Sequence, residues 1–533
     1  MTNKKSSQSW VESINSADVF PEIDFSPWKY PFLWGTGLNE ETLLEPLEQI
    51  YAFLASKKSK LHIGALQLEI ADLESDLLPI TTDAVGVNIT AQPQLFQLYA
   101  CELAYALAVA IPCMGEAEAL LIQARKALTD ATEAFFDEAG MPSVDVLPYF
   151  RFIFASWTRL RILEQKSKIN LFPERETLLY EWLTRNAILL TNPDGTQRFS
   201  QEVVLVKDKP EAELFKAALS LDPDEDDAHQ AAAALPWIPR YKAQAGKGVL
   251  MTEPSVYSEW SQVAVEQNGW DWNNPNVSIA YKDDIMETLF NLGGKRVFSG
   301  PWGTDVTVND KTLKSDGEWQ NVCWDCEDDY AYLEMELPLE NGASLGRTVC
   351  MAHEDQLLLM ADMVKFDKPA PKSRRIVCTS YLPLNGGFGY IPSEESTEGI
   401  LAGGRNSYTV FPLALSEWRE SAQGALDFQN NTLIYSTQMQ GNGLFAPLIF
   451  DLNPKRLKSA YTWRRLTVTE TGGEIVSSDK AVGYRLQIRD KNWLLYQSIV
   501  PPASRAVLGC HLVYQTLFAR FIKGEIDRIV AIE

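Results

Sequence analysis

The spacing of apolar residues changes near residue 248, and this change constrains the fold more than any other feature of the chain. Before that point, apolar residues recur at helical spacing; after it, short runs with strand periodicity are separated by clusters of glycine, asparagine and aspartate. The chain has 533 residues, which is more than one hydrophobic core usually organises. We therefore predict an N-terminal extension over residues 1–40, a helical domain over 41–248 and a β-domain over 249–533.

The N-terminal half carries repeated signals of amphipathic helices. The first lies in the segment ETLLEPLEQIYAFLASKK, where Leu43, Leu47, Ile50 and Leu54 recur at helical spacing. The run at 95–111 is apolar around its whole circumference, so we expect a helix there that is nearly engulfed. Further helices are predicted at 116–139, 147–166, 174–190, 211–220 and 225–235. Successive helices with short connections indicate a helical bundle or part of an (α/α) toroid.

The C-terminal half reads as a succession of strands with no helical crossovers between them. About thirteen such runs imply antiparallel sheets, and so many strands must pack into a large β-sandwich. The segment AHEDQLL, with His353 at its turn, is typical of a hairpin between two apolar strands. The last segment, from His511 to Ile532, is interpreted as a helix followed by a final edge strand.

Charge and composition limit the partners that this chain can have. The formal net charge is −23, which repels nucleic acid and anionic membrane surfaces, so neither is expected as a partner. A binding site for an acidic oligosaccharide would need a local cluster of arginine and lysine to overcome the repulsion from this net negative charge. The N-terminus has no signal-peptide core and no apolar stretch is long enough to span a membrane, so we predict a soluble cytoplasmic protein.

The seven cysteines are too sparse for a disulfide framework in a chain of this length. Cys323 and Cys326 form a C-x-x-C pair, but neither a second cysteine pair nor a histidine pair lies nearby to complete a tetrahedral zinc site. We therefore interpret both as ordinary thiols, and we predict no metal and no cofactor.

Five segments of the C-terminal half form a recognisable succession: VYSEWSQVAVEQNGW, NVCWDCEDDYAYLEMELPL, GRTVCMAHEDQLLLMADMV, YTVFPLALSEWR and TWRRLTVTE. Together they resemble the β-sandwich of the heparinase II/III-like polysaccharide lyases, especially an uncharacterised group in planctomycete bacteria. The resemblance covers about residues 255–533. The most typical element of the family is a strand that carries an arginine (the arginine strand), followed by a hairpin turn and a strand with the motif D-x-V (the D-x-V strand). In this chain the arginine is Arg347, the turn contains His353, and the aspartate is Asp362. That element is a fold signature without catalytic information.

The resemblance implies cleavage of uronate-linked polysaccharides by β-elimination. This reaction needs a group that neutralises the uronate carboxylate, a base that removes the C5 proton and an acid that protonates the leaving oxygen. In the resembling proteins tyrosine and histidine usually act as base and acid. The chain departs from that pattern because it has no export signal, few helices and only four histidines, none in a matching motif. No catalytic residue is therefore carried over.

Two sets of residues are nevertheless candidates for a site. The helix PYFRFIFASWTRLR concentrates Tyr149, Arg151, Trp157 and Arg159, which could present guanidinium and aromatic groups to an acidic sugar. The alternative is an amphipathic helix whose aromatic residues lie in the core and whose arginines pair with the many carboxylates. In the strand TWRRLTV, alternation sends Arg464 and Arg465 to opposite faces, so one of them would face the core or a cleft. A buried arginine there would need a partner, for which Asp451 and Glu334 are candidates.

His229 and Tyr241 flank the predicted domain boundary, where a cleft would let them act as base and acid. The alternative is an exposed histidine beside carboxylates and a tyrosine of the linker packed on the sandwich. Two functions follow from the whole sequence: a lyase on acidic oligosaccharides, or a non-catalytic carbohydrate-binding or protein-binding scaffold derived from the lyase fold. A protein partner or a homo-oligomer fits the second function, because the chain has 15 tryptophans.

Overall fold

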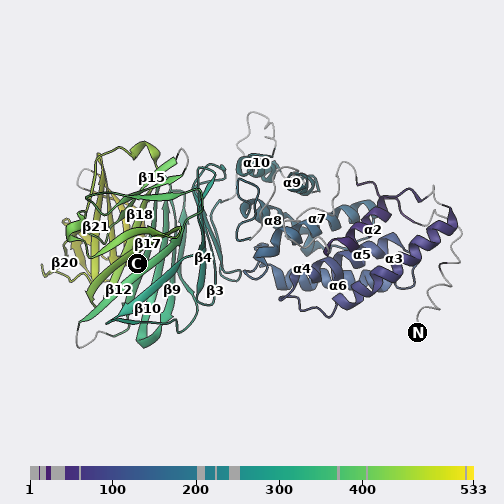
Figure 1. Cartoon of the computed structure of the whole chain (residues 1–533), viewed down its shortest axis with the longest axis horizontal. Helices are drawn as coiled ribbons and strands as arrows, with labels where there is room; N and C mark the ends of the chain where they lie inside the picture. The colour runs from purple at the N-terminus through teal and green to yellow at the C-terminus, as the bar shows by residue number, and fades with distance from the viewer. Residues whose placement is uncertain are drawn as a thin grey trace. The chain divides into compact units, whose positions relative to one another are not determined.

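The computed structural model divides into two compact units, Met1–Thr252 and Glu253–Glu533 (Figure 1). The predicted boundary at 248/249 lies a few residues before this division. The structure describes residues 11, 20–25, 43–58, 62–200, 210–221, 225–238, 253–368, 373–403, 406–522 and 525–533. The predicted acid or base Tyr241 lies outside the described residues.

The N-terminal unit is helical, as predicted. Its main helices are α2 (Glu45–Ala55), α3 (Ile63–Ala84), α6 (Ala117–Phe135), α7 (Phe150–Ser167), α8 (Glu174–Leu189), α9 (Pro210–Leu221) and α10 (Glu225–Ala234). The sequence prediction omitted α3, which buries a stripe that includes Leu66, Ile70 and Leu77 but carries Pro79 in its interior. Among the described helices, none is both long enough and apolar enough to cross a membrane.

The apolar run predicted at 95–111 forms the centre of this unit. It consists of the short helix α4 (Pro93–Leu95), the π-helix η5 (Phe96–Leu103) and α5 (Ala104–Ala110). Every residue of α5 is buried, which confirms that the run is engulfed. The π-helical turn places Glu102 inside the protein, where it meets a side chain from α7. Irregular turns of this kind often serve to direct particular side chains.

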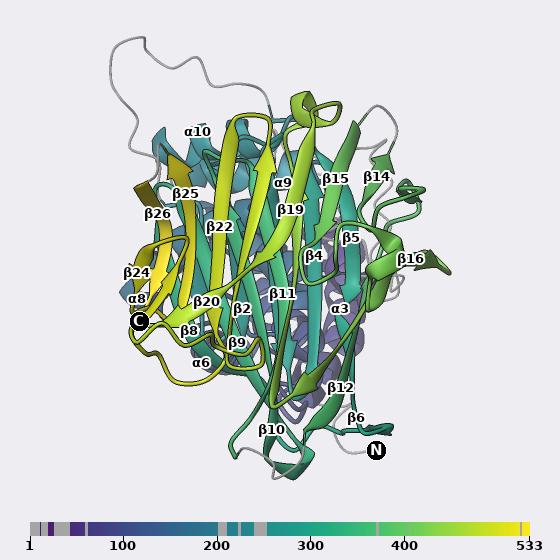
Figure 2. The ribbon, with the colours of Figure 1, turned by 90° about the vertical axis from the view of Figure 1, so that its left-hand side faces the viewer.

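The C-terminal unit consists of antiparallel sheets, as predicted (Figure 2). The first sheet contains, in spatial order, β1 (Val256–Ser258), β2 (Val263–Gln267), β3 (Asn276–Lys282), β4 (Ile285–Leu292) and β5 (Lys295–Pro301). The second contains β13 (Gly389–Pro392), β14 (Gly399–Gly403), β15 (Asn406–Pro412), β18 (Gly443–Asp451), β11 (Leu357–Phe366), β10 (Ala343–Ala352), β9 (Tyr330–Leu339) and β8 (Gln320–Glu327).

Three further sheets complete this unit. The third contains β16 (Gly424–Gln429), β17 (Thr432–Gly441), β12 (Arg374–Pro383), β6 (Gly303–Val308) and β7 (Lys311–Thr312). The fourth contains β19 (Tyr461–Leu466), β21 (Ala481–Ile488), β22 (Lys491–Ser498), β25 (Thr516–Ile522) and β26 (Glu525–Ile532). The fifth contains β20 (Val468–Glu470), β23 (Arg505–Val507) and β24 (Cys510–Leu512).

The central strands of the second and fourth sheets are buried on both faces. Figure 2 shows β19, β22 and β25 in front of β9 and β11, and Trp493 and Leu495 of β22 pack into the core shared with the second sheet. Leu494 and Tyr496 point the other way, into a core shared with the fifth sheet. Two-sided burial explains why β22 reads as a continuous apolar run instead of an alternating one.

The interpretation of the last segment as a helix was wrong. It forms β24, β25 and β26, and β25 pairs with both β22 and β26. Phe518 packs into one core of the fourth sheet, whereas Leu517 and Ala519 pack into the other. Burial on both faces of β25 removed the alternation by which the strand could have been recognised.

The arginine strand and the D-x-V strand are β10 and β11, which form the predicted hairpin. Arg347 and Asp362 lie directly opposite each other in its register, and their side chains form a buried ion pair with Nε and Oδ1 3.0 Å apart. His353 lies at the turn and is mostly buried. Its Nδ1 lies 2.9 Å from the Asp328 carbonyl oxygen, and burial lowers the pKa of the imidazole. Because a carbonyl only accepts, the neutral ring donates its proton from Nδ1.

Candidate functional site

Three of the predicted substrate-binding residues lie in the core of the helical unit. Arg159 is fully buried, and its Nε and Nη2 donate to the two carboxylate oxygens of Glu102 at 2.6 and 2.8 Å. Arg151 donates from Nη1 to the Gly195 carbonyl and from Nη2 to Thr191 Oγ1. Trp157 is fully buried as well. This placement favours the structural interpretation of α7 over substrate binding. The carboxylate that pairs with Arg159, that of Glu102, is buried as well.

Two other candidates of this unit are partly accessible. Tyr149 is half-buried and directly precedes α7. His229 is half-buried on α10, two residues after Asp227, which pairs with Arg185 of α8 at 2.7 Å. That ion pair fixes α10 against α8 and so fixes the backbone that carries His229. Because Tyr241 lies outside the described residues, the structure gives no geometry for the predicted pair.

The expectation that Arg464 or Arg465 would face the core was wrong. Both side chains are exposed, and Trp463 is the residue of β19 that enters the core, where its Nε1 donates to the Leu415 carbonyl at 3.1 Å. Since β19 is an edge strand, the sheet does not cover either arginine. The two carboxylates that were candidate partners are engaged elsewhere. Asp451 pairs with Arg456, and Glu334 accepts a hydrogen bond from the Tyr332 hydroxyl.

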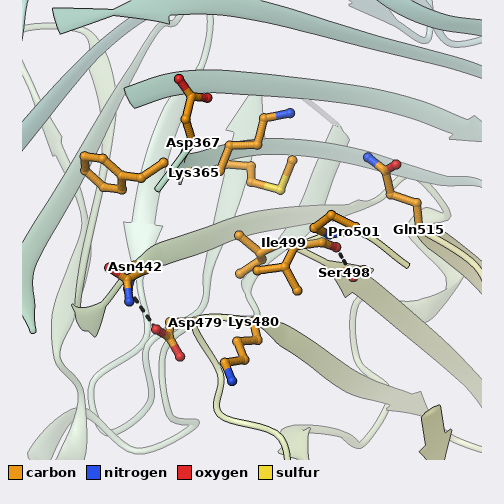
Figure 3. Close-up of a pocket in the computed structure, with 12 residues that line it drawn as sticks. Lys365, Asp367, Asn442, Asp479, Lys480, Ser498, Ile499, Pro501 and Gln515 are labelled. Atoms are coloured by element: carbon orange, nitrogen blue, oxygen red, sulfur yellow. Dashed lines mark hydrogen bonds between the residues drawn. The ribbon is translucent and has the colours of Figure 1, made fainter. Parts of the chain in front are cut away.

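The β-unit contains a pocket of about 530 Å³ between the second and fourth sheets (Figure 3). It opens where β11 and β22 end and β18 begins. The polar side chains that line it are Lys365, Asp367, Asn442, Asp479, Lys480, Ser498 and Gln515. Its apolar lining includes Met363, Ile499 and Pro501. Sequence reasoning missed this pocket because its residues come from five separate segments and have no common spacing.

One wall of the pocket is held rigidly by the turn between β17 and β18. The backbone N–H of Asn442 donates to Asp479 Oδ2 at 2.8 Å, and its side-chain oxygen accepts from Arg374 Nη1 at 3.0 Å. Glycine flanks Asn442 on both sides because the chains approach closely there. A Cβ atom would lie 2.4 Å from Asp479 Cβ at Gly441, and 2.4 Å from Ile499 Cγ2 at Gly443. A GNG triplet after a strand is the one sequence signal that could have indicated this turn.

A buried carboxyl group lies elsewhere in the β-unit, on β2. Burial raises the pKa of Glu266 well above its usual range, and the Met351 backbone offsets this only in part. Burial, with Glu266 nearby, also raises the pKa of the Cys350 thiol. The thiols of the C-x-x-C motif have raised pKa values through burial as well, that of Cys326 to about 12. Within the described part of the chain, no three such groups converge into a metal site.

Replacing Glu266 with glutamine is expected to flatten the pH dependence of stability. The folded pKa lies above the unfolded value of about 4.3, so the native state binds the extra proton and the free energy of unfolding falls as pH rises between the two values. The loss is about 1.4 kcal/mol for each pH unit in that window. Urea unfolding at pH 5 and at pH 8 measures this fall in the free energy of unfolding. An equal fall in the wild type and in E266Q would contradict the prediction.

The fold of this chain is similar to that of solved structures, although no sequence relative was found. No family model and no curated protein matches the chain. Solved structures do match, and they include polysaccharide lyases whose likeness covers both units.

The similar structures are, in particular, heparinases. A heparinase III gene product has a TM-score of 0.62 and 11% identity, with 93% of this chain and 81% of that chain covered. A heparan sulfate lyase from Pedobacter heparinus has a TM-score of 0.56 and 11% identity, with 93% and 79% covered. The predicted resemblance is thus confirmed for the fold, and it extends beyond residues 255–533 into the helical unit.

Proposed function

We propose that this protein acts on acidic, uronate-containing oligosaccharides by β-elimination. The observation that carries the proposal is the extent of the structural likeness, since 93% of the chain, with both units, matches structures named heparinase III and heparan sulfate lyase. A match to the sandwich alone would support only a shared scaffold, because such folds host many functions.

In the proposed reaction, His229 and Tyr241 are the two groups that transfer protons to and from the substrate. One removes the proton from C5 of the uronate, and the other protonates the oxygen of the leaving sugar. His229 is half-buried on a helix fixed by the Arg185–Asp227 ion pair, which suits a group that must keep its position. Tyr149 and Arg464 retain accessible surface with which to contact substrate.

A second function, carbohydrate or protein binding without catalysis, is favoured by the geometry of α7. The guanidinium groups of Arg151 and Arg159 are engaged inside the helical unit. Because both side chains are buried, they present no guanidinium group at the surface to bind an acidic ligand against the net charge of −23. A binder needs no catalytic base and can take a ligand elsewhere on the molecule.

The test of lyase activity is the ultraviolet absorbance of the unsaturated uronate that β-elimination creates. We expect purified protein to generate it from at least one member of a panel of uronate oligosaccharides. Proton-transfer groups contribute about 10²-fold to 10⁴-fold, so H229A and Y241F should each lose at least about 100-fold in rate. H511A is the matched control, because His511 is exposed on β24 and contacts Ser504. Silence of the folded wild type across the panel would overturn the lyase and leave the binding function.

A further inference from the structure

The pocket between the second and fourth sheets has a charge balance that differs from the rest of the chain. Its lining contains two lysines, Lys365 and Lys480, and two aspartates, Asp367 and Asp479. The ionised groups of the lining therefore cancel, within a protein whose net charge is −23. An anionic ligand would gain no net attraction inside this pocket and would be repelled by the protein as a whole.

We propose that this pocket is a second, non-catalytic binding site that takes a neutral, hydroxyl-rich ligand of one or two sugar residues. Its volume of about 530 Å³ lies within the range of small-molecule sites, about 300–1,000 Å³. The ligand class differs from that of the proposed lyase reaction, whose substrate is acidic. The site therefore stands independently of that reaction.

The arrangement of polar and apolar groups suits a sugar ring. Figure 3 shows Ile499 near the middle of the pocket, with Lys365 and Lys480 on opposite sides of it. Met363 and Pro501 add further apolar surface to the lining. A pyranose has an apolar face of C–H groups and a rim of hydroxyls, so it can place the face on this surface and the hydroxyls against the polar groups around it. Neutral sites of this kind combine mostly apolar walls with a few well-placed polar groups.

The polar groups of the lining provide both donors and acceptors. The Lys480 ammonium and the Gln515 amide can donate to hydroxyl oxygens, and the Asp367 carboxylate can accept from hydroxyl protons. Lys365 of β11 forms an ion pair with Glu336 of β9, across the intervening strand β10, which partly neutralises the lysine and further disfavours an anionic ligand. The rigid turn at Asn442 preforms one wall, which reduces the ordering that binding would require.

Two disaccharides that differ by one carboxylate test the site. Cellobiose is neutral, and cellobiouronic acid carries a carboxylate in place of one hydroxymethyl group. Titration calorimetry with the full chain should show cellobiose binding at least fivefold more tightly than the acid. In Q515W the indole would occupy part of the pocket and should weaken cellobiose binding at least tenfold. The backbone of Gln515 keeps its hydrogen bonds to Ser498 and Ile532, so the fold should tolerate this change. Q429W, on the exposed end of β16, is the matched control.

A variant that changes the charge of the pocket lining tests the class of ligand, whereas Q515W tests the location of the site. D367N gives the lining a net charge of +1 and should move the preference toward cellobiouronic acid by at least threefold. Because Asp367 is exposed, we expect the fold to tolerate this change. The proposal is overturned if cellobiose does not bind, if Q515W binds it as the wild type does, or if the wild type prefers the acid. None of these results bears on the production of unsaturated uronate, so the two proposals fail separately.

Discussion

Replacing Asp362 with alanine is expected to lower the free energy of unfolding of the β-unit by about 3–5 kcal/mol, as is typical when one partner of a buried ion pair is removed. Arg347 is 2% exposed and lies between the rings of Trp302 and Trp319, 4.1 and 4.8 Å from their centroids. Without Asp362, its charge would stay buried with neutral acceptors, namely the Trp302 carbonyl, Thr304 Oγ1 and the Met286 sulfur. Urea unfolding followed by tryptophan fluorescence measures the loss, because two indoles flank the guanidinium.

Two further variants separate this cause from a general loss of packing. Glu340 pairs with Lys311 at the surface, so E340A should cost less than about 1 kcal/mol. Replacing both buried partners, as in the double variant R347M/D362L, removes the uncompensated charge and should recover most of the stability. If D362A were no more destabilising than E340A, or if the double variant were the least stable, the ion pair would not hold this part of the sandwich.

The same pair explains how far the sequence predicts the fold. The resemblance to heparinase II/III-like proteins marks Arg347 and Asp362 as a signature, and because the two residues flank one hairpin they lie opposite each other in its register. The change of periodicity near residue 248 likewise separates the helical half from the strands. The final segment was misjudged because β25 is buried on both faces, which removes the alternation typical of a strand.

Site residues were harder to predict because their partners are distant in sequence. Arg159 reads as a surface charge of an amphipathic helix until Glu102, 57 residues away, is placed against it by the π-helical turn of η5. The pocket draws Asn442, Asp479 and Gln515 from three different connections, and no pattern within any one of them reveals the others. Local sequence reports periodicity, whereas a site depends on how the elements come together.

Replacing Glu102 with glutamine is expected to lower the free energy of unfolding of the helical unit by about 3–5 kcal/mol, because the buried Arg159 charge would lose the carboxylate with which it forms an ion pair. Both side chains of this pair are 0% exposed. The Tyr51 hydroxyl donates to the same carboxylate at 2.9 Å, and burial together with Glu102 raises the pKa of that phenol well above its usual range. Circular dichroism at 222 nm during urea unfolding reports the helices selectively.

The exposed pair of Lys126 and Asp130 on α6 supplies the control, and D130A should cost no more than about 0.5 kcal/mol. The double variant E102L/R159M should be markedly more stable than E102Q, because it leaves neither a charge nor an unpaired acceptor in the core. A small effect of E102Q would mean that water or another group replaces the carboxylate. The ion pair would then not hold the helical unit, whereas a loss of several kcal/mol, recovered in the double variant, assigns Arg159 to the fold.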